Sequence, residues 1–349
     1  MGKRGIVPVL AMLLVIEIGV AFAIVVAQPN GFGSIFNFGF GPEKQQPQPT
    51  QTFELNGVAA SLLINNGAGR VTIVGDAKAT ALSINATKIS RSNSSEAFNR
   101  LKYQVGRVGD KISIEAGESE FSDGFKFNAK IDLTITAPRN TVVSTKVGSG
   151  EIRVSGLENR VQAYSFETGS GSMFLTSLQT KTLLAKTGSG EIRLDTIEGA
   201  VEATTGSGGI ILNEVKGATA RLKSGSGRII VDRVTTALNA ETNSGSIKVT
   251  NADIQDLRLK TGSGSVYFMG QANINANSEV GSGSGSIELN FSSLGSNLPR
   301  FEVSTGSGDI NFKVAGLEIE QKDKHHLITA NNGPLLHIKN GSGSVKITG

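Results

Sequence analysis

Apolar and polar residues alternate in short segments along most of the chain, and the alternation returns at a regular interval. In the unit that begins at Glu191, two such segments are separated by a turn at Glu198-Gly199, and the predicted inward-facing residues are Ile192, Leu194, Ile197, Val201, Ala203 and Thr205. The next two units repeat this set as Ile210, Leu212, Val215, Ala220, Leu222 and Ser224, and as Ile229, Val231, Val234, Leu238, Ala240 and Thr242. A period of two is typical of strands with one buried face. Each unit is therefore expected to form a coil of two short strands and two turns.

A Gly-Ser-Gly triplet opens each unit. With Asn243-Ser244-Gly245 counted as a degenerate copy, the triplets begin at residues 148, 169, 188, 206, 225, 243, 262, 283 and 306. The steps of 18 to 23 residues indicate a solenoid, whereas a flexible Gly/Ser linker would lack ordered apolar segments between the triplets. The sequence predicts an all-β fold: a single-stranded parallel β-solenoid (β-helix) with coils of about 19 residues.

Glycine at the corners has a physical reason. Stacked coils lie about 4.8 Å apart, so a corner side chain would collide with the next coil, and glycine also adopts positive φ without steric cost. We expect the serine inside each triplet to form a ladder of hydroxyl hydrogen bonds. We expect local bulges at Asn243 and at the overlapping GSGSGS of residues 281–286.

Both ends of the repeat diverge, as the exposed ends of a solenoid require. At the N-terminal end, "LLINNGAGRVTIVGD" (62–76) reads as a divergent coil, followed by a short helix near 95–103, a hairpin turn at 108–111 and the strands "KISIEA" and "KIDLTITAP". At the other end, the insert 316–340 separates the triplet at Gly306 from the final "GSGSVKITG". We predict that both ends are enlarged capping coils of one solenoid domain, residues 53–349.

The first 52 residues have a different composition. Residues 6–27 contain one charge, Glu17, and at about 1.5 Å per residue they are long enough to cross a bilayer as a helix. A cleaved signal peptide is the alternative. Lys3 and Arg4 keep residues 1–5 cytoplasmic under either reading, which places the rest of the chain outside. Residues 28–52, Phe/Gly-rich and then Pro/Gln-rich, are expected to be an extended, polyproline-like linker.

Composition narrows the class of partner. The chain has 44 glycines, no cysteine and no tryptophan, and 5% of its residues are aromatic, which favours a thin aliphatic core and excludes disulfides and thiolate metal sites. The net charge of +4 is spread without a basic block, so nucleic acid is not an expected partner.

Candidate chemistry is sparse. A calcium ladder would need an acid recurring after the triplet, but Arg228 stands there in one coil. Glu151, Glu191 and Glu202, with Arg153 and Arg193 nearby, are read as a solvated strand surface. The three histidines, His325, His326 and His337, give no metal pattern, and "KDKHH" is expected at a polar hairpin end. We predict no catalytic, cofactor-binding or metal-binding residues, and no enzyme activity.

One outward stripe stands out as a contact surface. Phe174, Ile211, Ile230 and Tyr267 fall at equivalent outward positions of different coils. Such a stripe is expected either to contact a protein partner or to be ordinary scattered exposure.

The "INNGAGRVTIVGD" segment, the segment "IDLTITAPRNTVVSTKVGSGEIRVSGL", the run of "TGSG" coils and the closing "NNGPLLHIKNGSGSVKITG" resemble the bacterial putative-adhesin family, a domain of unknown function related to the head GIN domains of autotransporter adhesins. The resemblance covers residues 53–349. It implies an all-β solenoid in an exported or membrane-anchored protein, with no established catalytic site.

Three functions follow as expectations. The first is a membrane-anchored, surface-exposed binding module that contacts a protein or glycan through a repetitive face. The second is a structural scaffold of the cell envelope that associates with itself, and the third is a carbohydrate-active β-helix enzyme. A fold alone does not choose among them.

Overall fold

The computed structural model describes residues 43–55, 60–91, 95–118 and 129–349. These residues form 26 strands and one short helix, α3 (Ser95–Arg100). The predicted cytoplasmic segment 1–5, the anchor 6–27 and most of the linker lie outside the described residues. Within the described ranges, no helix combines the length and apolar character needed to span a bilayer.

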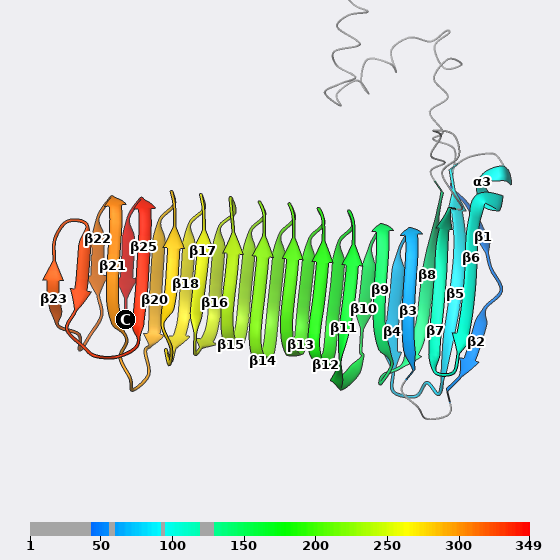
Figure 1. Ribbon diagram of the computed structural model, residues 1–349, viewed down its shortest axis with the longest axis horizontal. Helices are drawn as coiled ribbons and strands as arrows, with labels where there is room; N and C mark the ends of the chain where they lie inside the picture. Colours follow the sequence, from blue (N-terminus) through cyan, green and yellow to red (C-terminus); the bar gives the residue numbers. More distant parts are fainter. Residues whose placement is uncertain (1–42, 56–59, 92–94, 119–128) are drawn as a thin grey trace, which may run out of the picture.

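The centre of the molecule is a stack of parallel coils (Figure 1). In four central coils a single strand runs through the coil: β12 (Met173–Thr187), β13 (Ile192–Thr205), β14 (Ile210–Ser224) and β15 (Ile229–Thr242). Equivalent residues pair in register, with Ile192 opposite Ile210 and Ile210 opposite Ile229. The all-β parallel solenoid is therefore confirmed; these four coils have one bent strand each, whereas others, such as the coil of residues 247–261, have the two strands expected.

The bend in each strand lies at a residue that the sequence does not mark. Five residues have φ between 50° and 55°, and they recur at the coil interval: Ser177, Thr196, Glu214, Arg233 and Asn251. A register irregularity lies close to these bends, as between Glu198 and Val201 after Thr196 and between Thr250 and Ala252 around Asn251. The left-handed region is costly for residues other than glycine. This second corner is therefore held by the pairing of its neighbours and not by the residue type at the bend.

The core between the two halves of each coil is thin and aliphatic, as predicted. All 18 residues assigned to the inside of three consecutive coils are buried. Aromatic rings enter the core toward the C-terminal end, where Phe268, Phe291, Phe301 and Phe312 form a chain with centroid distances of 5.4, 6.1 and 5.2 Å.

The corner glycines are required by close approach. A Cβ atom on Gly190 would lie 1.9 Å from the carbonyl oxygen of Gly171, and one on Gly227 would lie 1.9 Å from that of Gly208. Neither Gly190 nor Gly227 has φ in the left-handed range. The collision argument is confirmed, and the positive-φ argument is wrong for these two corners.

A hydroxyl ladder runs along the corners, but at a different residue from the predicted one. The buried hydroxyl before each triplet donates to a glycine carbonyl of the preceding coil and accepts from an amide of its own triplet. Thr205 donates to Gly190 O at 3.1 Å and accepts from Gly208 N at 3.1 Å. The same pair of bonds recurs at Thr168, Thr187, Ser224, Thr242, Thr261 and Ser282. The triplet serines are exposed, because the apex of the turn points away from the stack.

The expected bulges at the irregular triplets are not present. The amide of Asn243 donates to Gly225 O at 3.2 Å and its carbonyl accepts from Ser263 N at 3.0 Å, as in a regular corner. Pairing also runs without a register shift through Gly281. One glycine of the triplet can be replaced without loss of register.

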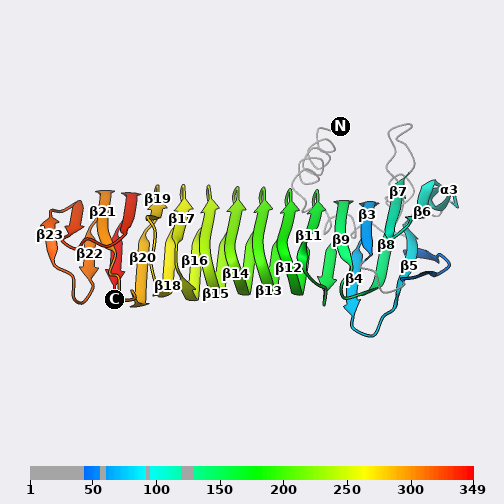
Figure 2. The same ribbon diagram turned by 60° about the horizontal axis from the view of Figure 1, so that its bottom comes forward.

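The first coil of the chain is not the outermost coil. Strands β3 (Ser61–Ala68) and β4 (Val71–Asp76) form this coil; β7 (Lys111–Glu118) with β8 (Ala129–Pro138) and β9 (Val142–Ser149) with β10 (Ile152–Ser155) form its neighbours. β3 pairs in parallel with both β7 and β9, and β4 with both β8 and β10. The first coil is therefore inserted between two coils that follow it in sequence (Figure 2).

Antiparallel strands close the N-terminal end. β5 (Ala81–Ser90) pairs with β8, and β1 (Lys44–Pro47) and β2 (Gln51–Glu54) pair with β5. The predicted hairpin joins β6 (Leu101–Val108) to β7, and the helix stops at Arg100 because β6 begins at the next residue. Residues of the expected linker that the structure describes are extended, and their backbone in β1 and β2 pairs with β5 and so covers its edge.

The C-terminal end repeats the insertion. β19 (Ser278–Ser282) with β20 (Ile287–Ser293) and β21 (Arg300–Ser307) with β22 (Ile310–Lys313) are separated by the last coil, β25 (Leu335–Ser342) with β26 (Val345–Thr348). β25 pairs with β19 and β21, and β26 with β20 and β22; β25, red, lies beside β21, orange, in Figure 1.

The remaining strands complete the stack and its cap. β24 (His326–Thr329) pairs antiparallel with β21 and with β23 (Ile319–Lys322), so "KDKHH" lies at a hairpin end as predicted. β11 (Glu158–Thr168), β16 (Ile247–Ile254), β17 (Leu257–Thr261) and β18 (Val266–Ala272) continue the regular coils.

Candidate binding faces

Each coil presents two outward faces, one from each half of its strand. Face 1 carries the outward residues of the segment that follows the triplet, such as Arg193, and face 2 those of the segment that precedes the next triplet, such as Glu202 and Thr204. Because equivalent residues pair in register, outward side chains form columns along the stack. A binding site on either face is therefore built from equivalent positions of successive coils.

The predicted apolar stripe lies in one column of face 1, but basic residues interrupt it. The column runs Arg153, Phe174, Arg193, Ile211, Ile230, Lys248 and Tyr267. The guanidinium carbon of Arg153 lies 4.5 Å from the ring centroid of Phe174, and Lys248 Nζ lies 5.9 Å from that of Tyr267. All four apolar side chains are half-buried. The structure thus brings them together as a column of alternating cationic and apolar groups.

The candidate carboxylates do not form a catalytic pair. Glu151 and Glu191 occupy one column with Ser172 between them, whereas Glu202 lies on the other face. Glu151 is bound to Arg153 and also to Arg70, whose Nε lies 2.9 Å from Glu151 Oε1. Burial raises the pKa of Glu151, but the hydrogen bonds and charges of the two arginines outweigh it and hold the pKa below its ordinary value. A glycosidase general acid needs the opposite shift.

The histidines are placed by the C-terminal cap. The amides of His325 and His326 donate to Asp323 Oδ1 at 2.8 and 2.7 Å, which forms the turn between β23 and β24 and lowers the pKa of Asp323. His337 lies on face 2, opposite Glu279 and Glu302. In the part of the chain that the structure describes, no three His, Asp or Glu side chains gather as a metal site would require.

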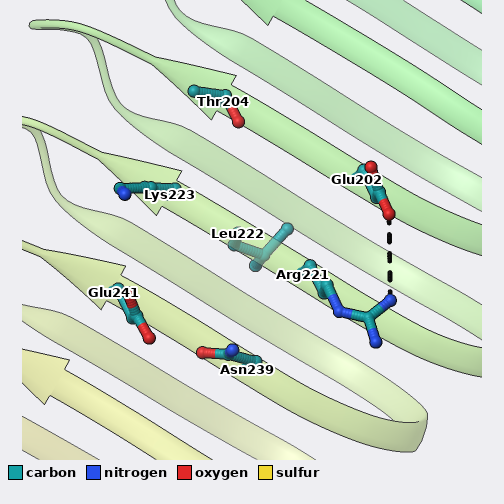
Figure 3. Close-up of a pocket in the computed structure, with 7 residues that line it drawn as sticks. All are labelled: Glu202, Thr204, Arg221, Leu222, Lys223, Asn239 and Glu241. Atoms are coloured by element: carbon teal, nitrogen blue, oxygen red, sulfur yellow. Dashed lines mark ion pairs between the residues drawn. The ribbon is translucent and has the colours of Figure 1, made fainter.

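Face 2 contains a shallow polar depression of about 200 Å³ near the middle of the stack (Figure 3). Seven residues from three consecutive coils line it: Glu202, Thr204, Arg221, Leu222, Lys223, Asn239 and Glu241. Arg221 Nη1 lies 3.8 Å from Glu202 Oε1. Asn239 Oδ1 is buried and has no hydrogen-bond partner among the described residues. Two carboxylates, Glu202 and Glu241, balance the two cationic side chains, so the lining is polar and carries no net charge.

A family model matches nearly all of the solenoid, over residues 60–297 and again over 199–348. The chain belongs to the Toastrack DUF4097 family. The resemblance to a family of unknown function is thereby confirmed. Among curated proteins, none matches the chain.

Two crystal structures are similar to this Toastrack chain. One is of a putative cell adhesion protein from Clostridium sporogenes ATCC 15579, with 12% identity, a TM-score of 0.23 and coverage of 87% of this chain and 99% of that one. The other is of a putative adhesin from Bacteroides fragilis NCTC 9343, with 14% identity, a TM-score of 0.35 and coverage of 87% and 96%. Both TM-scores are too low for either likeness to carry an argument about function.

Of the residues that line the face 2 depression, the sequence pointed to Glu202 as an outward carboxylate and to Leu222 as a core residue, but not to the other five. Arg221, Lys223 and Asn239 look like ordinary solvent-facing residues when each Toastrack coil is read alone. Alignment of the outward positions of successive coils, which lie 18 or 19 residues apart here, would have shown the columns.

Proposed function

We propose that this Toastrack protein is a membrane-anchored, surface-exposed binding module. Residues 6–27 form the anchor, residues 1–5 stay in the cytoplasm, and the solenoid that starts near residue 53 stands outside on the linker. Lys3 and Arg4 before a long apolar segment support this orientation. If the segment is cleaved, the same solenoid is secreted.

The observation that supports a binding role is the register of the outward side chains. From β11 to β18 the pairing is parallel, so equivalent outward positions recur at about 4.8 Å intervals along each face. A single exposed ion pair contributes at most about 1 kcal/mol. Several such contacts to one polymer add their strength, because the first contact raises the effective concentration of the others.

Two measurements test the proposal. In intact cells that express the full-length chain, protease added outside should digest the solenoid, and digestion only after lysis would contradict the orientation. Purified full-length chain should be retained on envelope fractions and on glycan arrays.

A matched control comes from the repeat itself. Excision of residues 188–224 joins Thr187 to Gly225 and removes two whole coils with the Thr-Gly-Ser-Gly corner preserved. Retention should weaken in proportion to the lost length. Undiminished retention would mean that binding does not use the central faces.

A structural scaffold is the second candidate, and the C-terminal end favours it. Phe312, Val314 and Leu317 are only partly buried there, and Ile319 is 43% exposed. β22 pairs with β26 alone among the described strands, so its other edge can accept a second chain. Self-association in sedimentation experiments that is lost on Ile319→Lys would favour the scaffold, and release of sugar from polysaccharides would instead favour an enzyme.

A further inference from the structure

Five lysines recur at every second coil in one column of face 2. The column, which we call the lysine column, runs Lys146, Glu167, Lys186, Thr204, Lys223, Glu241, Lys260, Gly281 and Lys339. Its last member belongs to the inserted C-terminal coil, so only the structure brings Lys339 into line. Two coils span about 9.6 Å, and the five lysines therefore extend over roughly 38 Å.

Three of these lysines are free to bind a partner. Lys146 lies 4.0 Å from Glu167 and Lys260 lies 2.6 Å from Glu279. No carboxylate of a described residue lies within 4.0 Å of Lys186, Lys223 or Lys339, and all three are exposed.

Charge pairing within the protein does not explain the spacing. If the lysines served only to pair with neighbours, the positions between them would all be acidic, since opposite charges directly across a pair of strands are favourable. Thr204 and Gly281 occupy two of the four intervening positions, so the column holds five lysines against two glutamates and has a net charge of +3.

The surroundings of the column are polar and hydroxyl-compatible. The central depression contains Lys223, with Thr204 and Asn239 beside it (Figure 3). Face 2 presents no Phe, Tyr or Trp in this column or in the adjacent one, which runs Ser144, Ser165, Leu184, Glu202, Arg221, Asn239, Arg258, Glu279 and His337. A ligand on this face is therefore held by charge and hydrogen bonds and not by ring stacking.

We propose that the lysine column binds a linear acidic polysaccharide that lies along the stack axis, with one carboxylate at each of the three free lysines, Lys186, Lys223 and Lys339. This assignment rests on the proposed binding function and names its ligand class. An extended disaccharide of pyranose rings is similar in length to two coils, so a polymer with one uronic acid per disaccharide matches the spacing of the lysines. Hydroxyls of the intervening sugar face Thr204, which lies between Lys186 and Lys223 in the column.

Nucleic acid matches this column poorly. A nucleic acid strand carries a phosphate about every 3.4 Å along its axis, which would leave most phosphates without a cation. Lysines as sparse as these suit a polymer of lower charge density.

Binding of the full-length chain to hyaluronan, which has one carboxylate per disaccharide, tests the proposal. At low salt we expect binding to hyaluronan and not to neutral dextran. The triple variant K186Q/K223Q/K339Q should bind roughly tenfold more weakly. The matched control R193Q/R228Q/K248Q removes three charges from face 1 and should change affinity by less than about twofold.

A charge-neutral swap separates spacing from charge. T204K/K223T keeps the net charge and places two lysines on adjacent coils. We expect its affinity for hyaluronan to fall about fivefold. The thermal unfolding temperature of the variant, measured in parallel, shows whether it is folded. Equal binding by the swap and the parent chain, or tighter binding to DNA or polyphosphate than to hyaluronan, would overturn the inference. If envelope fractions retain the parent and the triple glutamine variant equally, the lysine column is not the site although the binding function stands. If nothing retains the parent chain, both proposals fail.

Discussion

The central coils and the two ends of the stack use the same corner motif but differ in which coils touch. Between β12 and β15 each coil packs on the coils that precede and follow it in sequence. At the ends, the first coil contacts β7–β8 and the last coil separates β19–β20 from β21–β22. The order of repeats in the sequence thus predicts the order of coils in the stack only where the coils are alike. At the ends, where the coils differ, the stacking order depends on which strand edges pair.

The ends show why the insertion is useful. A terminal coil that were also outermost would be held by one interface and would fray. By insertion, the chain gives each of its terminal coils two parallel neighbours and leaves antiparallel strands, β5 with β1 and β2 at one end and β24 with β23 at the other, to cover the edges.

Removal of the last coil should have the largest effect. Truncation after residue 334 deletes β25 and β26 and leaves β19, β20, β21 and β22 without a parallel partner on one side. We expect a loss of at least about 5 kcal/mol, beyond the usual range of single changes, with residues 300–334 released to limited proteolysis. Excision of one central coil, residues 188–205, is the control and should leave a folded, shorter stack; equal damage by both deletions would contradict the distinction between ends and centre.

Substitution of a corner glycine in a central coil should cause the second largest loss of stability. Gly190→Val or Gly227→Val places a Cβ against a carbonyl oxygen of the adjacent coil, and we expect a loss of about 3 kcal/mol in denaturant unfolding. Gly281→Ala is the matched control, because its Cβ would meet only Lys339 O at 3.7 Å and Lys260 Cγ at 4.0 Å. An unchanged unfolding midpoint for the valine variants would show that the corners are looser than this geometry requires.

The hydroxyl ladder should have a smaller effect. Thr205→Val removes one donor and one acceptor and leaves Gly190 O and Gly208 N without their partner, which should cost about 2 kcal/mol. Ser207→Ala changes the exposed triplet serine and should stay within about 0.5 kcal/mol. A larger loss of stability for Ser207→Ala than for Thr205→Val would indicate that the triplet serine forms the ladder.

The smallest expected effect is a pH dependence at the N-terminal insertion. Glu151 joins Arg70 of the first coil to Arg153 of the next, and its folded-state pKa is lowered. A lowered carboxyl pKa stabilises the fold above the unfolded value of about 4.3 and loses that contribution as pH falls through the folded value. Glu151→Gln should therefore cost about 0.5 to 1 kcal/mol at neutral pH, and the difference should shrink as pH falls through the lowered folded-state pKa of Glu151. A constant difference across this range in thermal unfolding would point to packing and not to charge.

The regular coils were predictable because alternating burial requires alternating apolar and polar residues, and closely stacked corners require glycine. The inward sets of β13, β14 and β15 were assigned residue by residue and are buried. The bends at Thr196, Glu214 and Arg233 were not predictable, since these residues share no type, whereas the turn expected at Glu198-Gly199 coincides with a φ of 140° at Gly199 and a register shift between Glu198 and Val201. The face 2 depression was missed because its residues meet only after register is fixed.

The sequence by itself determined that this Toastrack chain forms a parallel all-β solenoid, where its glycine corners lie and which residues fill its thin core, because glycine and alternation are local requirements that each coil must meet. Only the tertiary structure decided the order of the coils at the two ends, the residue that carries the hydroxyl ladder and the alignment of Lys339 with the other lysines. These features depend on which edges pair, and pairing energy is set by partners far apart in the chain.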